Sequence, residues 1–205
     1  MLPFVTPRVE AFAWDTPIFH ALNRDFGPVV DALVRFFHSP RSGLLCGAAL
    51  LAWAVWKWRA RAVPIVLASV LAVVATDVLG ARVLKPMLAR ARPCYALGPG
   101  SFRQVVPAAN SGSLPSLHAA NWFAAVAPLA LAAPPAAPVL LGLAAVVSLS
   151  RVVGGVHWPS DVLFGALVGM GMGLLATLLV RALFRRWRAR TGTLAPPPGA
   201  KALQK

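Results

Sequence analysis

Three stretches of the sequence hold polar residues whose types could act together on a phosphate group. In chain order they are Lys85 and Arg92, then Ser116 and His118, then Arg151, His157 and Asp161. Cations gathered in one place repel one another, by about 4 kcal/mol for a pair 4 Å apart at an effective dielectric constant near 20. If the three stretches meet, a multiply charged anion would relieve this repulsion. The guanidinium fork of Arg92 or Arg151 suits two oxygens of one phosphate.

The starts of two apolar runs favour the same kind of ligand. Pro115 and Pro159 are suited to the first turn of a helix, where proline costs nothing and the free N–H groups point outward. Such N–H groups and the positive end of the helix bind phosphate readily. We therefore expect Ser116 and Leu117 to offer backbone N–H donors to a phosphate, beside the hydroxyl of Ser116.

Two histidines adjoin this inferred pocket and would complete a reaction. One imidazole can attack phosphorus while the other protonates the departing oxygen. Asp161 lies four residues after His157 and can accept the proton of its far ring nitrogen, which leaves the attacking nitrogen unprotonated. This arrangement makes His157 the nucleophile and His118 the proton donor.

Apolar runs must position these residues, and their composition indicates a membrane protein. Hydrophobic residues make up 58% of the 205 residues and charged residues only 13%, whereas charged residues reach about 25% in soluble domains. The runs cover about 43–57, 62–84 and 116–133, then the stretch from the APPAAP break to about 152, and finally 159–184. Each is near the roughly 20 residues that a helix needs to cross a bilayer. The predicted fold class is an all-α, polytopic transmembrane helical bundle with five spans.

The segments outside these runs suggest three parts. Residues 1–41 are expected to lie on the membrane surface as an amphipathic segment, because 16–38 mix charges with apolar positions at helical spacing. If this segment inserted, it would add a sixth span. Residues 42–188 would form the transmembrane domain, and 189–205 a disordered basic tail.

Basic residues between the runs predict the orientation. The KWRAR and RALFRRWRARTG segments are expected to be cytoplasmic, because short cytoplasmic segments carry an excess of Lys and Arg. The C-terminus would then be cytoplasmic in a multi-pass protein of the cell inner (plasma) membrane. The three polar stretches would face the periplasm or outside.

The three stretches together resemble a known family. Residues 85–93 have the form K-x6-R-P, residues 115–118 the form P-S-x-H, and residues 150–161 the form S-R-x5-H-x3-D. They resemble the type 2 phosphatidic acid phosphatase (PAP2) superfamily of integral-membrane lipid phosphatases, over about residues 60–180. Leu117 stands where this family most often has glycine.

The resemblance implies a role for each matched residue. Phosphate would be bound by Lys85, Arg92, Arg151 and Ser116, with His118 as general acid, His157 as the residue that forms a phosphohistidine, and Asp161 as its support. The resemblance also implies an enzyme that needs no metal or other cofactor. A metal site at the histidines is disfavoured in any case, because the three cations would repel a divalent ion.

The resemblance implies hydrolysis of a phosphomonoester or diphosphate of a lipid, with undecaprenyl diphosphate as the preferred substrate. Phosphatidylglycerophosphate, phosphatidic acid and lipid A phosphates are alternative substrates. A lipid phosphotransferase and a non-enzymatic anion-binding membrane protein are alternative functions. The net charge of +14 does not indicate nucleic acid, since the cations lie at the ends of apolar runs. Membrane lipids are the expected partners, and the sequence does not indicate an oligomeric state.

Other conspicuous residues are assigned structural or surface roles. Three arginines outside the motifs are expected to contact lipid headgroups or solvent: Arg82, Arg90 and Arg103. Asp77, inside an apolar run, is expected to be structural and paired with Arg82 or with a polar group of another span. Trp158 is expected in an interfacial aromatic belt, and the GALVGMGMG segment at 165–173 is expected to pack closely against another helix.

Overall fold

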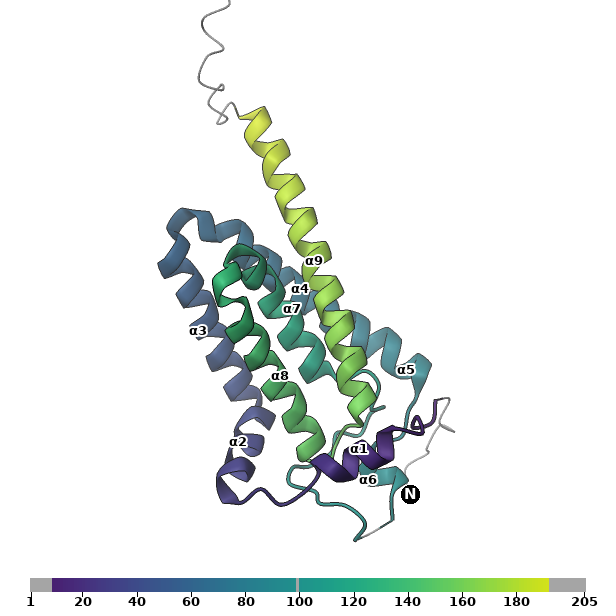
Figure 1. Ribbon diagram of the computed structural model, residues 1–205. Coiled ribbons are helices and arrows are strands. Elements are labelled where there is room, and N and C mark those ends of the chain that lie inside the picture. The colour runs from purple at the N-terminus through teal and green to yellow at the C-terminus, as the bar shows by residue number, and fades with distance from the viewer. Residues whose placement is uncertain (1–8, 99, 192–205) are drawn as a thin grey trace, which may run out of the picture.

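The computed structural model describes residues 9–98 and 100–191, and within these ranges the chain forms helices without any β-strand. The long helices are α3 (Pro40–Trp58), α4 (Ala62–Leu79), α7 (Leu117–Ala132), α8 (Ala137–Val153) and α9 (Pro159–Arg190). They pack side by side, and each runs opposite to the one before it (Figure 1). The predicted all-α bundle is thus confirmed.

The membrane-spanning character follows from length and hydropathy. Within the residues that the structure describes, three helical stretches are long and apolar enough to cross a bilayer: Pro40–Ala96, Pro134–Val153 and Pro159–Arg190. The first of these contains both α3 and α4, which reverse direction at Arg59–Arg61. Helix α7 is apolar but shorter, at 16 residues. The chain is therefore a multi-pass membrane protein.

Packing between α7 and α9 is close because glycines of α9 face the backbone of α7. A Cβ atom added to Gly165 would lie 2.5 Å from the carbonyl oxygen of Ser116, and one added to Gly169 would lie 2.0 Å from that of Ala120. A third glycine, Gly173, faces α7 one turn further on. The predicted helix-packing role of 165–173 is confirmed, and this seam fixes the start of α7 beside the start of α9.

Helix α4 continues through the π-helical turn Gly80–Leu84 into the short helix α5 (Lys85–Leu88). Helix α5 ends at Ala89, which has a left-handed backbone conformation with φ of 41°. The short helix α6 (Pro93–Ala96) follows. These turns redirect the chain at one end of the bundle, where three cationic side chains of this segment are buried: Lys85, Arg90 and Arg92.

The N-terminal segment forms two helices rather than one. Helix α1 (Asp15–Leu22) and helix α2 (Pro28–His38) are separated by a break at Gly27, whose φ of 87° suits glycine. Both helices lie at the same end of the bundle as α5 and α6 (Figure 1). Phe19 of α1 packs against Trp158, and Val34 of α2 packs in a cluster with Val156. The segment is thus part of the packed protein, and its position on the membrane surface stays a prediction.

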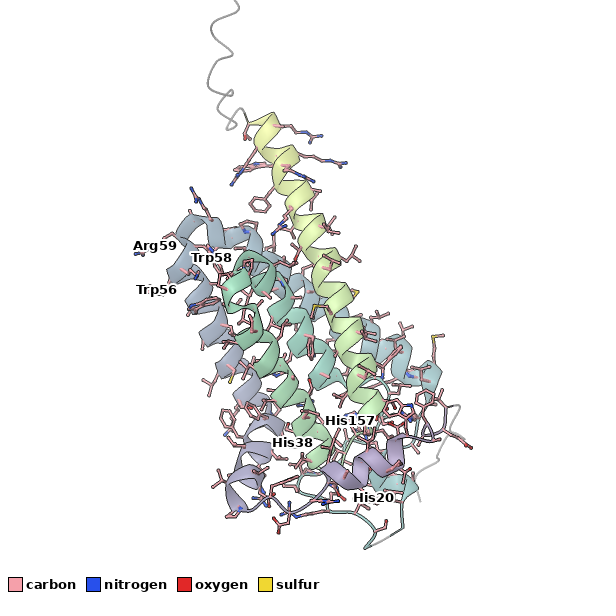
Figure 2. The ribbon with its side chains drawn as sticks, in the orientation of Figure 1. His20, His38, Trp56, Trp58, Arg59 and His157 are labelled. Carbon is pink, nitrogen blue, oxygen red and sulfur yellow. The ribbon has the colours of Figure 1, made fainter. Side chains whose placement is uncertain are left out.

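Tryptophans are distributed differently at the two ends. Trp56 and Trp58 lie beside Arg59 at the end opposite to His38 and His157 (Figure 2). The prediction that Trp158 belongs to an interfacial belt is wrong: its side chain is only 1% exposed, and its Nε1 donates a hydrogen bond of 2.9 Å to the carbonyl of Ala91.

The predicted C-terminal tail begins within α9, and residues 192–205 lie outside the described residues.

Candidate active site

A large cavity runs along the bundle, and its polar part lies at the end that carries α5 and α6. Its volume is 1340 Å³. One part is lined by side chains from all three polar stretches: Lys85, Arg92, His118, Arg151 and His157. The rest is lined mainly by apolar residues of α3, α4 and α7. The structure therefore brings together residues up to 72 positions apart in the sequence.

His157 lies between α8 and α9 and is 3% exposed. Its Nε2 is 3.0 Å from Nη1 of Arg92, and its Nδ1 is 3.4 Å from Oδ2 of Asp161. A guanidinium group can only donate, so Nε2 must accept, and the ring proton sits on Nδ1 facing Asp161. Burial, followed by the charges of Arg92, Lys85 and Arg151, holds the pKa of His157 well below its ordinary value. The ring is therefore neutral, with its lone pair on Nε2.

Asp161 is fixed at the first turn of α9. Its Oδ2 accepts a hydrogen bond of 2.8 Å from the backbone N–H of Trp158, as the acid of a capping box does. Its Oδ1 accepts 2.7 Å from Nη1 of Arg90. These two donors orient the carboxylate, which in turn orients the ring of His157.

Arg90 does not contact lipid or solvent, contrary to the sequence-based prediction. Its side chain is 1% exposed and forms ion pairs with Asp15 and Asp161. Asp15 also accepts hydrogen bonds from the N–H and hydroxyl groups of Ser160, at 2.8 and 2.7 Å. A buried guanidinium is tolerated because two carboxylates surround it. The prediction failed because Asp15 lies 75 residues away in sequence.

Two of the expected phosphate-binding cations are held by backbone carbonyls, two of these carbonyls in the loop before α7 and one between α8 and α9. Nζ of Lys85 donates a hydrogen bond of 2.5 Å to the carbonyl of Gly112. Nε of Arg92 donates 2.9 Å to the carbonyl of Ser111, and its Nη1 donates 2.9 Å to that of Val156. These carbonyls hold both cations at the cavity wall.

Arg151 is the cation with the most unused donors. It is 3% exposed, and its Nη2 lies 3.1 Å from Nδ1 of His38. Its Nε and Nη1 are buried and make no hydrogen bond to any residue that the structure describes. Buried guanidinium donors without acceptors are costly, and oxygens of a bound phosphate would satisfy them.

The residues at the start of α7 differ in part from expectation. Helix α7 begins at Leu117 with Ser116 as its N-cap, so Pro115 precedes the first turn instead of occupying it. The backbone N–H of Ser116 already donates 3.0 Å to the carbonyl of Asp161, so it is not the phosphate donor that we expected. The Ser116 hydroxyl is buried and has no partner among the described residues. The side chain of Leu117 packs against Gly80, which leaves it room.

His118, the second residue of α7, lines the cavity and stacks on His38. The two ring centroids are 6.4 Å apart and the planes differ by 3°. Figure 2 shows that His38 and His157 lie at the same end of the bundle. Sequence analysis did not identify His38 as part of the site, because it lies outside the three motifs and 113 residues before its partner Arg151.

The remaining polar residues have structural partners. Asp77 accepts a hydrogen bond of 2.9 Å from Nδ2 of Asn121, so it pairs with another helix, one of the two options predicted, and not with Arg82. Arg103 was expected to contact headgroups or solvent, but it forms two hydrogen bonds to Asp31 of α2, at 2.7 and 2.5 Å. This pairing lowers the pKa of Asp31. Arg82 is exposed, as expected.

Comparison with known proteins identifies a matching family model and two solved structures with a similar fold. The family model described as the PAP2 superfamily matches residues 62–185. No curated protein sequence matches the chain significantly. Among solved structures, LpxE of Aquifex aeolicus is 25% identical with a TM-score of 0.64, over 82% of this chain and 97% of that one. A transmembrane PAP2 type phosphatidylglycerolphosphate phosphatase from Bacillus subtilis is 23% identical with a TM-score of 0.58, over 85% and 86%, and shares the fold.

Proposed function

Because the chain belongs to the PAP2 superfamily of membrane phosphatases, we propose that it hydrolyses a lipid phosphate through a phosphohistidine on His157. One observation carries the proposal. The ring of His157 is fixed by Arg92 at Nε2 and by Asp161 at Nδ1. It lies at the wall of a cavity that is also lined by Lys85 and Arg151. A neutral imidazole beside three cations is suited to attack a phosphoryl group.

The apolar part of the cavity supports a lipid as substrate. It extends along α7 from His118 to Leu129, a distance of about 16 Å at 1.5 Å per residue. Opposite α7, the cavity wall includes Leu44 and Leu51 of α3 and Val70 of α4. A hydrocarbon tail buried there gains roughly 0.8 kcal/mol for each CH₂ group.

Among lipid phosphates we propose undecaprenyl diphosphate as the preferred substrate, and its long isoprenoid tail is compatible with this apolar wall. Phosphatidylglycerophosphate, phosphatidic acid and lipid A phosphates are the alternatives to be compared with it.

The reaction proceeds in two steps. The phosphate first binds to Arg151 and draws Nη1 of Arg92 away from His157, and Nε2 then forms a bond to phosphorus. As the bond between phosphorus and the leaving oxygen breaks, His118 gives that oxygen a proton. In the second step His118 takes a proton from water, the water oxygen bonds to phosphorus, and the bond to Nε2 breaks. Asp161 stabilises the positive ring of the intermediate.

The direct test is phosphate release by the purified protein in detergent from a panel of lipid phosphates. His157→Ala is expected to lower kcat by roughly a thousandfold or more, because the nucleophile is lost. His20→Ala is the matched control, since this exposed histidine of α1 lies outside the cavity. A folded His157→Ala protein with wild-type activity would refute the mechanism. Labelled phosphate found on a second lipid instead of in solution would indicate a phosphotransferase.

The proposed orientation places the site on the periplasmic or outer side of the inner (plasma) membrane. It is supported by the basic residues at the opposite end, where Arg59 and Arg61 join α3 to α4 and Arg188 and Arg190 lie in the last turn of α9. Short cytoplasmic segments carry such an excess of cations.

A further inference from the structure

His38 is a third histidine at the cavity, contributed by a part of the chain that the family model does not cover. We propose that His38 is a positioning residue, which holds the guanidinium of Arg151 for the phosphate and supports the ring of His118. The inference rests on the proposed function, because it assigns the phosphate to Arg151 and the proton transfer to His118.

The contact with Arg151 has a defined direction. Arg151 can only donate, so Nδ1 of His38 is the acceptor of the 3.1 Å hydrogen bond from Nη2. This contact fixes the position of Nη2 of the guanidinium group. Nε and Nη1, which are buried and have no acceptor among the described residues, are thereby held in one orientation within a residue that lines the cavity. An arginine held in this way loses less conformational freedom when the phosphate arrives.

His38 must be neutral to accept this hydrogen bond, and its surroundings keep it so. Burial lowers the pKa of His38, and the charges of Arg151 and Arg92 lower it further. No carboxylate among the described residues hydrogen-bonds to its ring to oppose this. His38 therefore adds an acceptor to the site without adding a fourth positive charge.

The contact with His118 is a parallel, offset stack, as the 6.4 Å separation of ring centroids and the 3° angle between planes indicate. The stack restricts rotation of the His118 ring. His38 thus touches both the residue that would hold the phosphate and the residue that would protonate the leaving group.

The fold holds His38 firmly at this place. It is the last residue of α2, and α3 begins two residues later at Pro40. Helix α2 is anchored by the ion pair between Asp31 and Arg103. Val34 packs in the cluster that contains Val156, the residue before His157. The same packing therefore positions His38 and the proposed nucleophile.

Three substitutions of His38 distinguish the effect of its hydrogen bond to Arg151 from the effect of its stacking on His118. His38→Ala removes both the acceptor and the ring, and His38→Phe keeps a ring without the acceptor. In His38→Asn, Oδ1 lies the same number of bonds from Cα as Nδ1 of histidine, so the acceptor is retained without the ring. His20→Ala again serves as the matched control.

The readouts are KM and kcat for the best lipid phosphate, and the rise in unfolding temperature caused by orthovanadate, a phosphate analogue, followed by tryptophan fluorescence. We expect His38→Ala and His38→Phe to raise KM roughly tenfold and to weaken the vanadate effect, since a hydrogen bond to a charged group is lost. His38→Asn is expected to bind vanadate nearly as the wild type does. Its kcat should be lower than that of the wild type, because the stacked ring is missing.

Unchanged KM and vanadate stabilisation in folded His38→Ala and His38→Phe would overturn the inference. So would a His38→Asn protein that binds vanadate as weakly as His38→Phe does. If His38→Ala does not fold, the comparison of His38→Asn with His38→Phe decides. Should the wild type hydrolyse no lipid phosphate, the proposed function fails while the vanadate measurement still tests the contact with Arg151.

Discussion

Arg90 is the residue through which the N-terminal helix reaches the proposed nucleophile. Its guanidinium lies between Asp15 of α1 and Asp161 of α9, and Asp161 in turn faces His157. Ser160 completes the cluster through its hydrogen bonds to Asp15 and Arg90. Arg90 is the cation that pairs with both carboxylates, so removing it leaves Asp15 and Asp161 buried without an opposite charge.

Replacing Arg90 by glutamine should therefore be severely destabilising. Two buried carboxylates would lose their cation, which typically costs 3–5 kcal/mol. We expect a clear fall in the unfolding temperature of Arg90→Gln in detergent, together with loss of phosphate release. The double variant Asp15→Asn with Arg90→Gln should be more stable than Arg90→Gln alone, because one of the two unpaired charges is removed. An Arg90→Gln protein that unfolds at the wild-type temperature would contradict the ion-pair network.

At this scale, the sequence allowed prediction of residues whose partners lie within a motif. His157 and Asp161 could be linked because Asp161 lies four positions after His157, and this spacing places both at a helix start. Arg90, Asp15 and His38 could not be identified, since their partners are 71 to 145 residues away. Only the fold of the N-terminal helices against the bundle brings these side chains together.

The seam between α7 and α9 is the element that holds the two motif histidines at a fixed separation. His118 lies in the first turn of α7 and His157 lies two residues before α9. The glycines at 165, 169 and 173 are four residues apart and so share one face of the helix. Any side chain on this face must move α9 away from α7.

Gly169→Ala tests this seam, and Gly171→Ala is its matched control in the same helix. A Cβ atom at Gly169 would lie 2.0 Å from a backbone oxygen of α7, whereas one at Gly171 would meet nothing within 4 Å. We expect Gly169→Ala to lower both the unfolding temperature and kcat. Gly171→Ala should be neutral or slightly stabilising, because alanine favours helix by about 1 kcal/mol over glycine. Equal effects of the two substitutions on unfolding and activity would show that the seam does not act as described.

Elements were predicted well where the pattern was long and apolar. The runs at 43–57, 62–84 and 159–184 correspond to α3, α4 with its extension, and most of α9. The boundary at Pro115 was wrong by two residues, because Ser116 takes the N-cap position and its N–H bonds to α9. The break at Gly27 was missed, since the mixed charges of 16–38 fit one amphipathic helix as well as two.

The whole molecule has two chemically different ends. One end carries α1, α2 and the loop before α7, and the other carries the connection at Arg59–Arg61 and the basic last turns of α9 (Figures 1 and 2). The polar residues of the cavity lie at the first of these ends. Helix α9 has 32 residues, about 48 Å at 1.5 Å per residue. This exceeds the roughly 30 Å of a hydrocarbon layer, and the basic end of α9 extends beyond the other helices (Figure 1).

Cysteine labelling tests how these ends are oriented. In a background that lacks Cys46 and Cys94, Ser101→Cys would mark the loop at the cavity end and Ala60→Cys the opposite end; both positions are exposed. A membrane-impermeant maleimide is expected to label Ser101→Cys in right-side-out vesicles. It should label Ala60→Cys only after the vesicles are opened. The reverse pattern would place the cavity on the cytoplasmic side and refute the proposed orientation.

The contact between Arg92 and Nε2 of His157 also bears on selectivity in the resting enzyme. An electrophile dissolved in the bilayer that reaches the empty cavity meets an imidazole whose reactive electrons are already engaged by a guanidinium. Only a molecule with negatively charged oxygens can compete for the guanidinium of Arg92 and so free Nε2 of His157. Reactivity is thus coupled to the arrival of an anion, and neutral alkylating agents should modify His157 slowly until one is bound.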